Sequence, residues 1–221
     1  MAKNSDFQFE EIKELNKDNL ISIIRHNTNH VLVLLKEINF NNLLENSRIA
    51  KKLQKNKIIL MYLTKEYMKT SCDVYPLEYI SMKNSYEVVY GDDILQELNV
   101  PTDNVRLESE QKIKGALIRI TQIILEMGDR KKELSKTVFL AVEDIVHGIK
   151  GLLNLAGVTL PDTAAAVLDS AQKQFNIELQ PVKDIVNWRS GTAPEDYKKL
   201  IYDFYEKIEE LAVLADKMEI S

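Results

Sequence analysis

Short apolar runs and helically spaced apolar residues alternate along the first hundred residues of the chain. Two runs, at 20–24 and 31–35, flank an asparagine-rich stretch, which is typical of a β-hairpin. The alternative is that residues 20–25 form the end of a preceding helix. An amphipathic stretch over 43–53 predicts a helix, and the apolar run at 58–64 predicts a buried strand after it. Helix and strand therefore alternate, as in a unit that packs helices around a sheet.

The segment at residues 72–83 carries an alternating, aromatic-rich run with a proline inside it. The alternation predicts a strand, and because Pro76 has no N–H for a sheet ladder, we expect this strand at a sheet edge or at a bulge. Either position places Asp73 near the end of the sheet, which is where many α/β folds bind their ligands. A further strand is predicted at 86–91, so the small mixed sheet extends to Gly91.

After Pro101 the apolar residues take the spacing of long amphipathic helices. Thr192 and Glu195 have the spacing of a capping box for the last of these helices. We therefore expect an α+β chain, with a small mixed-sheet domain at residues 1–102 and an all-helical bundle at 103–221. The five helices of the bundle are predicted at about residues 105–127, 133–155, 163–175, 182–189 and from 194 onward.

Composition and charge limit the partners that the chain is expected to bind. Hydrophobic residues make up 45% of the chain and charged residues 29%, as in a globular protein. The net charge of −5 gives no general attraction to nucleic acid or to anionic membranes, so neither is an expected partner. The first residues are too polar for a signal peptide, no apolar run is long enough to span a membrane, and Cys72 is the only cysteine. We expect a soluble, cytoplasmic protein.

Three segments of the chain occur in a recognisable order and spacing. They read DVYPLEYISMK at 73–83, YEVVYGDDIL at 86–95 and VRLESEQKIKGALIRITQ at 105–122. Together they resemble a family of prokaryotic nucleotidyltransferase-fold proteins, and the likeness extends over about residues 30–216. The resemblance implies a nucleotidyltransferase-like domain followed by a helical bundle, with a nucleotide in the cleft between the two.

The resemblance also implies a metal-dependent transfer site, which this chain carries only in part. Active members hold metal ions with an Asp-x-Asp on one strand and a third carboxylate on a later strand, and a Gly-Ser turn admits the phosphates. Asp73 aligns with the third carboxylate and is the candidate catalytic residue. Asn29 and His30, followed by the apolar residues Val31 to Leu35, stand where the Asp-x-Asp belongs, and the first glycine of the chain is Gly91.

The helix expected near residue 105 carries the candidate ligand-binding residues, which are Arg106, Glu110 and Lys114. By the resemblance, these side chains would face the cleft between the domains, and we expect Asp73 in the same cleft. Glu110 and Lys114 are also four residues apart with the acid first, which is the spacing of an ordinary surface ion pair.

The other polar residues have plain structural explanations. Asp73 could simply start a strand, and Asp92 and Asp93 precede a short helix whose dipole they would complement. His26 and His30 are four residues apart, but they lie in a turn-forming stretch rather than on a helix, so no metal site is predicted.

Three functions follow from these observations. The first is a catalytically degenerate nucleotidyltransferase-like protein that binds a nucleotide-like small molecule, a protein partner or a second copy of itself, without a cofactor. The second is an active enzyme that holds Mg²⁺ with Asp73 and Asp92 or Asp93. The third is a purely structural interaction protein without a ligand. The missing Asp-x-Asp favours the first.

Overall fold

The computed structural model of the protein describes residues 3–27, 29–128, 131–190 and 194–218. The chain divides into two compact units. Unit 1 comprises Met1–Val74 and Ser81–Val100, and unit 2 comprises Tyr75–Ile80 and Pro101–Ser221. The short segment Tyr75–Ile80 therefore belongs with the helices that follow it much later in the sequence. The assignment of residues 1–102 and 103–221 to a nucleotidyltransferase-like domain and its bundle stays a prediction.

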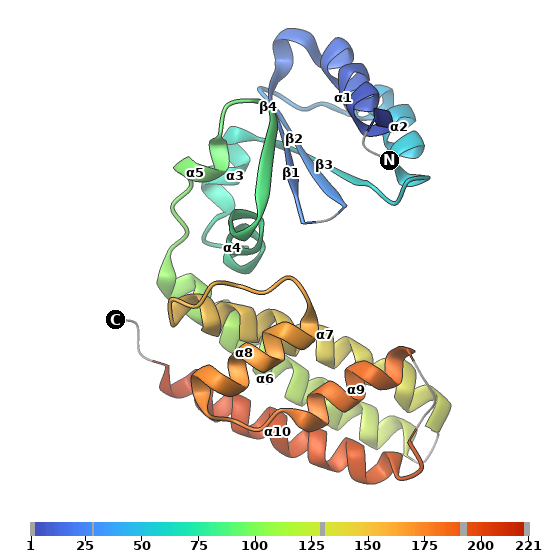
Figure 1. Cartoon of the computed structure of the whole chain (residues 1–221), viewed down its shortest axis with the longest axis vertical. Helices are drawn as coiled ribbons and strands as arrows, with labels where there is room; N and C mark the ends of the chain where they lie inside the picture. Colours follow the sequence, from blue (N-terminus) through green and yellow to red (C-terminus); the bar gives the residue numbers. More distant parts are fainter. Residues whose placement is uncertain (1–2, 28, 129–130, 191–193, 219–221) are drawn as a thin grey trace. The chain divides into compact units, whose positions relative to one another are not determined.

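Unit 1 contains a mixed four-stranded sheet with the strand order β3-β2-β1-β4 (Figure 1). Strand β1 is antiparallel to β2 and to β4, while β2 and β3 run parallel. The predicted hairpin and the mixed sheet are confirmed, and residues 20–25 form a strand rather than the end of a helix. The strands are β1 Leu20–His26, β2 His30–Leu35, β3 Ile59–Thr64 and β4 Tyr86–Gly91.

The helices of unit 1 begin where polar side chains satisfy their first N–H groups. Asn39 accepts a hydrogen bond from Asn42 N at the start of α2, and Thr64 accepts one from Tyr67 N at the start of α3. Helices α1 and α2 cover one face of the sheet (Figure 1), where Phe9 packs with apolar residues of both central strands. The elements are α1 Lys3–Asn16, the 3₁₀ turn η1 Lys17–Asn19, α2 Phe40–Gln54, α3 Lys65–Ser71 and α5 Ile94–Glu97.

The strand predicted within residues 72–83 is wrong, because Pro76–Asn84 forms helix α4. Pro76 occupies the first turn of this helix, where the missing N–H costs nothing. The alternation of aromatic and aliphatic residues concealed a second, helical spacing. The residues that this helix buries are Leu77, Tyr79, Ile80 and Met82, which lie three residues apart in two pairs.

Unit 2 is the predicted helical bundle, and the structure confirms five helices among the residues described after Pro101. Helix α6 packs along α7 and α10. The last helix starts later than predicted, at Tyr197, because Asp196 caps it by accepting a hydrogen bond from Lys199 N. Thr192, the first residue of the predicted capping box, lies outside the described residues. None of the helices described is long and apolar enough to cross a membrane. The bundle consists of α6 Thr102–Met127, α7 Lys131–Leu155, α8 Ala164–Phe175, α9 Gln180–Ser190 and α10 Tyr197–Lys217.

Two glycines of α7 let neighbouring elements approach it closely. A Cβ atom added at Gly151 would lie 1.9 Å from Ser109 Oγ and 2.6 Å from Leu77 Cδ2, and one added at Gly148 would lie 2.9 Å from Ser109 O. Leu77 N also donates to Glu108 Oε2 over 3.0 Å. Segment Tyr75–Ile80 is thus held against α6 and α7 by both packing and a hydrogen bond.

Candidate functional site

Strand β2 occupies the place where the resemblance puts an Asp-x-Asp. Its residues Val31 to Leu35 are all aliphatic and at most 1% exposed. The strand pairs with β1 on one side and with β3 on the other, so it lies in the middle of the sheet. Buried aliphatic side chains therefore stand at the positions where the resemblance would place two carboxylates.

Asp73 lies in the turn between α3 and α4 and is exposed. It does not lie at the end of a strand, because the strand predicted around it is a helix. Cys72 beside it is buried, its thiol donates to Met68 O over 3.1 Å, and burial raises the pKa of this thiol. Since Asp73 belongs to unit 1 and Arg106 to unit 2, the predicted cleft that contains both stays a prediction.

Asp93 has the structural role that the sequence favoured for it. Its carboxylate accepts from Gln96 N at 3.1 Å, which caps α5, and from the Tyr86 hydroxyl at 3.0 Å. Burial, followed by this bond to Asp93, raises the pKa of Tyr86. In the parts of the chain that the structure describes, no group of three or more His, Cys, Asp or Glu side chains could hold a metal ion.

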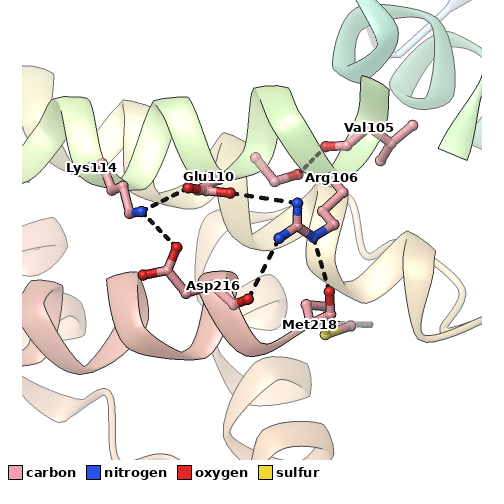
Figure 2. A network of polar contacts seen from close by, with 7 residues as sticks. Val105, Arg106, Glu110, Lys114, Asp216 and Met218 are labelled. Atoms are coloured by element: carbon pink, nitrogen blue, oxygen red, sulfur yellow. Dashed lines mark hydrogen bonds and ion pairs between the residues drawn. The ribbon is translucent and has the colours of Figure 1, made fainter. Parts of the chain in front are cut away.

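Arg106, Glu110 and Lys114 form one polar network with the end of α10 (Figure 2). Lys114 Nζ lies 2.7 Å from Glu110 Oε1 and 2.6 Å from Asp216 Oδ1. Arg106 Nε donates to Met218 O over 2.9 Å, and one of its terminal nitrogens lies 3.7 Å from Glu110 Oε2. The bonds to Asp216 and Glu110 raise the pKa of Lys114, and the bond from Lys114 lowers the pKa of Asp216.

This network balances its own charge, with two cations and two carboxylates. The ion pair between Glu110 and Lys114 that their spacing predicted is confirmed. Arg106 binds backbone carbonyls at the C-terminal end of α10, where a cation also complements the helix dipole. A phosphate group at this place would have to compete with Glu110 and Asp216, so ligand binding by Arg106, Glu110 and Lys114 stays a prediction.

Replacing Arg106 with glutamine should lower the free energy of unfolding of unit 2 by about 1 kcal/mol, because the carbonyls at the end of α10 lose a charged donor. Lys199→Gln is the matched control, because Lys199 forms a solvent-exposed ion pair with Asp203 and its loss should change the stability far less. Urea denaturation measures both changes. Equal losses in the two variants would contradict a special role of Arg106.

The hairpin brings together two histidines for which the sequence predicted no shared site. His26 on β1 and His30 on β2 are direct partners across the strands, and their ring centroids lie 5.5 Å apart. His26 is only 4% exposed. Burial, and to a lesser extent the neighbouring His30, lowers the pKa of His26 to about 4.

This low pKa predicts a loss of stability in mild acid. Unfolded His26 takes up a proton below about pH 6.5, whereas folded His26 stays neutral until about pH 4, so stability falls between these two values. Between pH 7.5 and pH 5.5 we expect His26 to contribute a loss of about 1.4 kcal/mol. Denaturation of the wild type and of His26→Phe at both pH values measures it. Identical pH dependence in the two proteins would contradict the prediction.

An open groove of about 760 Å³ lies between α1 and α2 on the surface of unit 1, lined by residues of both helices. Leu15 and Leu44 line it and are 40% and 53% exposed, beside Glu14, Glu45 and Arg48. Sequence reasoning missed this groove, because the exposure of Leu15 and Leu44 depends on how α1 and α2 pack against each other.

Comparisons of the chain with protein-family models, with curated proteins and with solved structures gave no match.

Proposed function

We propose that this chain is a nucleotidyltransferase-like protein that acts by binding and does not transfer nucleotidyl groups. The proposal joins the resemblance of residues 30–216 to one observation, the aliphatic filling of β2. Two-metal transfer needs carboxylates around ions that bridge the phosphates and the attacking hydroxyl. Leu32 and Leu34 are fully buried in that strand and offer no ligand to such ions.

The remaining carboxylates give the active-enzyme alternative little support. Asp93 is engaged by Tyr86 and by the first turn of α5, and Asp73 lies in a turn after α3 rather than on a strand. Mg²⁺ requires several oxygen ligands, and among the residues that the structure describes no group of three or more His, Cys, Asp or Glu side chains could hold it.

The test is to incubate the purified protein with labelled nucleoside triphosphates, Mg²⁺ or Mn²⁺ and a pool of acceptors, beside Asp73→Asn. We expect no metal-dependent transfer by either protein. Turnover that requires the metal and disappears in Asp73→Asn would overturn the proposal and make Asp73 part of an active site.

Binding is tested separately by thermal unfolding with nucleotides, since a ligand of the native state raises its apparent stability. Arg106→Gln and Lys199→Gln serve as a matched pair. A nucleotide that stabilises the wild type and Lys199→Gln but not Arg106→Gln would place the ligand at the network of α6 and α10. Stabilisation of all three proteins would place it elsewhere, and no stabilisation favours a protein partner or a second copy of the chain.

A further inference from the structure

We propose that His26 and His30 form a two-histidine site for a divalent transition metal ion at the end of the β1–β2 hairpin. The two residues are in register as direct partners of an antiparallel pair. Such partners have Cβ atoms about 4.5–5.5 Å apart and project from the same face of the sheet. The hairpin therefore holds two imidazoles beside each other, which is the arrangement that a chelating pair requires.

The spacing of the two rings suits one shared ion. Their centroids lie 5.5 Å apart and their planes differ by 28°. Two imidazoles on one tetrahedral zinc ion have centroids about 5 Å apart, because each nitrogen binds the metal at about 2.0–2.1 Å. Rotation of the rings about their Cβ–Cγ bonds is the adjustment that would direct both nitrogens to one point.

Each ring has a buried nitrogen without a hydrogen-bond partner. His26 Nε2 and His30 Nδ1 are two of the four side-chain nitrogen and oxygen atoms in this condition among the residues described. A buried polar atom without a partner costs free energy, and native proteins usually satisfy such atoms with protein groups, water or an ion. A shared metal ion would satisfy both nitrogens at once.

Asn27 is the neighbour that would support a metal-bound His26. Its side-chain amide nitrogen lies 3.4 Å from His26 Nδ1. With a metal on Nε2, Nδ1 carries the proton, and the Asn27 amide can turn its oxygen toward it to accept the hydrogen bond. The neutral imidazole is the form that binds a metal ion.

Imidazole ligands select the metals that the site would take. Zn²⁺, Ni²⁺ and Cu²⁺ all bind imidazole, and Cu²⁺ binds a given nitrogen site most tightly. His30 is partly exposed, so the pair lies next to solvent, and water would complete the coordination of an ion held by two histidines. The sequence alone argued against this site because four residues of spacing suggests a chelating pair only on a helix, whereas here a hairpin brings the residues together.

The experiment is to titrate the protein with Cu²⁺ and with Zn²⁺ at pH 7.5, following heat and the imidazole resonances of the histidines. We expect one ion per chain, with perturbation of the rings of His26 and His30. His26→Gln and His30→Gln should each weaken binding at least tenfold. The double variant should bind about as weakly as either single variant, because each single substitution already removes the chelate. His147→Gln, which removes a histidine elsewhere in the chain, should bind as the wild type does.

Circular dichroism of each metal-free variant shows whether it is folded, and only folded variants enter the comparison. If His26→Gln does not fold, His30→Gln and perturbation of the His26 ring in the wild type decide the question. Binding that survives both single substitutions, binding lost in only one of them, or a wild type that binds no more tightly than the double variant would each overturn the proposal.

Discussion

Replacing Gly91 with alanine should lower the free energy of unfolding of unit 1 by about 3 kcal/mol or more. Gly91 ends β4 with a φ of +79°, which L-amino acids with a side chain rarely adopt. An alanine Cβ would lie 2.0 Å from Ile21 O and 3.0 Å from Ser22 Cα. These are backbone atoms of β1, which pairs with β2 and β4 on its two sides and so has little freedom to move away.

Gly128→Ala is the matched control, because it introduces backbone strain without a steric clash. Gly128 follows α6 with a φ of +51°, and an added Cβ would have no atom within 4 Å. Its φ of +51° is combined with a ψ of −123°, which residues with a side chain rarely adopt, so backbone strain alone should cost about 1–3 kcal/mol. Denaturant titrations that resolve the transitions of the two units give both values. If Gly91→Ala loses no more free energy of unfolding than Gly128→Ala does, then β1 moves far enough to accommodate the added Cβ and the prediction is wrong.

Replacing Gly151 with alanine should destabilise unit 2 by about 2 kcal/mol, although alanine is the better helix former. The added Cβ would lie 1.9 Å from Ser109 Oγ, which already donates to Val105 O, and 2.6 Å from Leu77 Cδ2. Overpacking of this kind typically costs about 1–3 kcal/mol. The thermal or urea-induced unfolding of unit 2 measures the loss.

Gly115→Ala is the matched control on the neighbouring helix α6. An added Cβ at Gly115 would have no atom within 4 Å, so only the helix preference acts and the variant should gain about 0.5–1 kcal/mol. Ser109→Ala combined with Gly151→Ala should recover part of the lost stability, because it removes the closest atom. Loss of stability at both glycines, or no recovery in the double variant, would contradict the packing argument.

The sequence predicted the sheet well where strands were uniformly apolar and failed where two periods overlapped. The runs at 31–35 and 58–64 have no competing spacing, so β2 and β3 lie close to their predicted places. The prediction that 58–64 is a buried strand is wrong, because β3 lies at the edge of the sheet and Ile59 and Met61 are exposed. Around Pro76 the alternation of Tyr75, Leu77 and Tyr79 coexists with the helical pairs Leu77–Ile80 and Tyr79–Met82. Only packing against partners distant in the chain decides between the two.

In the candidate site, too, contacts within one helix were predictable, whereas contacts between residues distant in the sequence were not. The pair of Glu110 and Lys114 depends on a spacing within one helix and was predictable. Asp216, which completes the network, is about a hundred residues away, and nothing in its local sequence marks it as a partner. The pairing of His26 with His30 likewise depends on the register of a hairpin, which the chain fixes only when the sheet forms.

The assignment of Tyr75–Ile80 to unit 2 has a consequence for synthesis on the ribosome. The chain emerges from its N-terminus, so Leu77 leaves the exit tunnel before Ser109 and well before Gly151. Unit 1 can begin to fold around its sheet before the helices that Tyr75–Ile80 packs against, α6 and α7, have been synthesised. A fragment that starts at Pro101 would likewise lack Leu77 and the bond from Leu77 N to Glu108, leaving an apolar surface at the glycines of α7 open to other nascent chains.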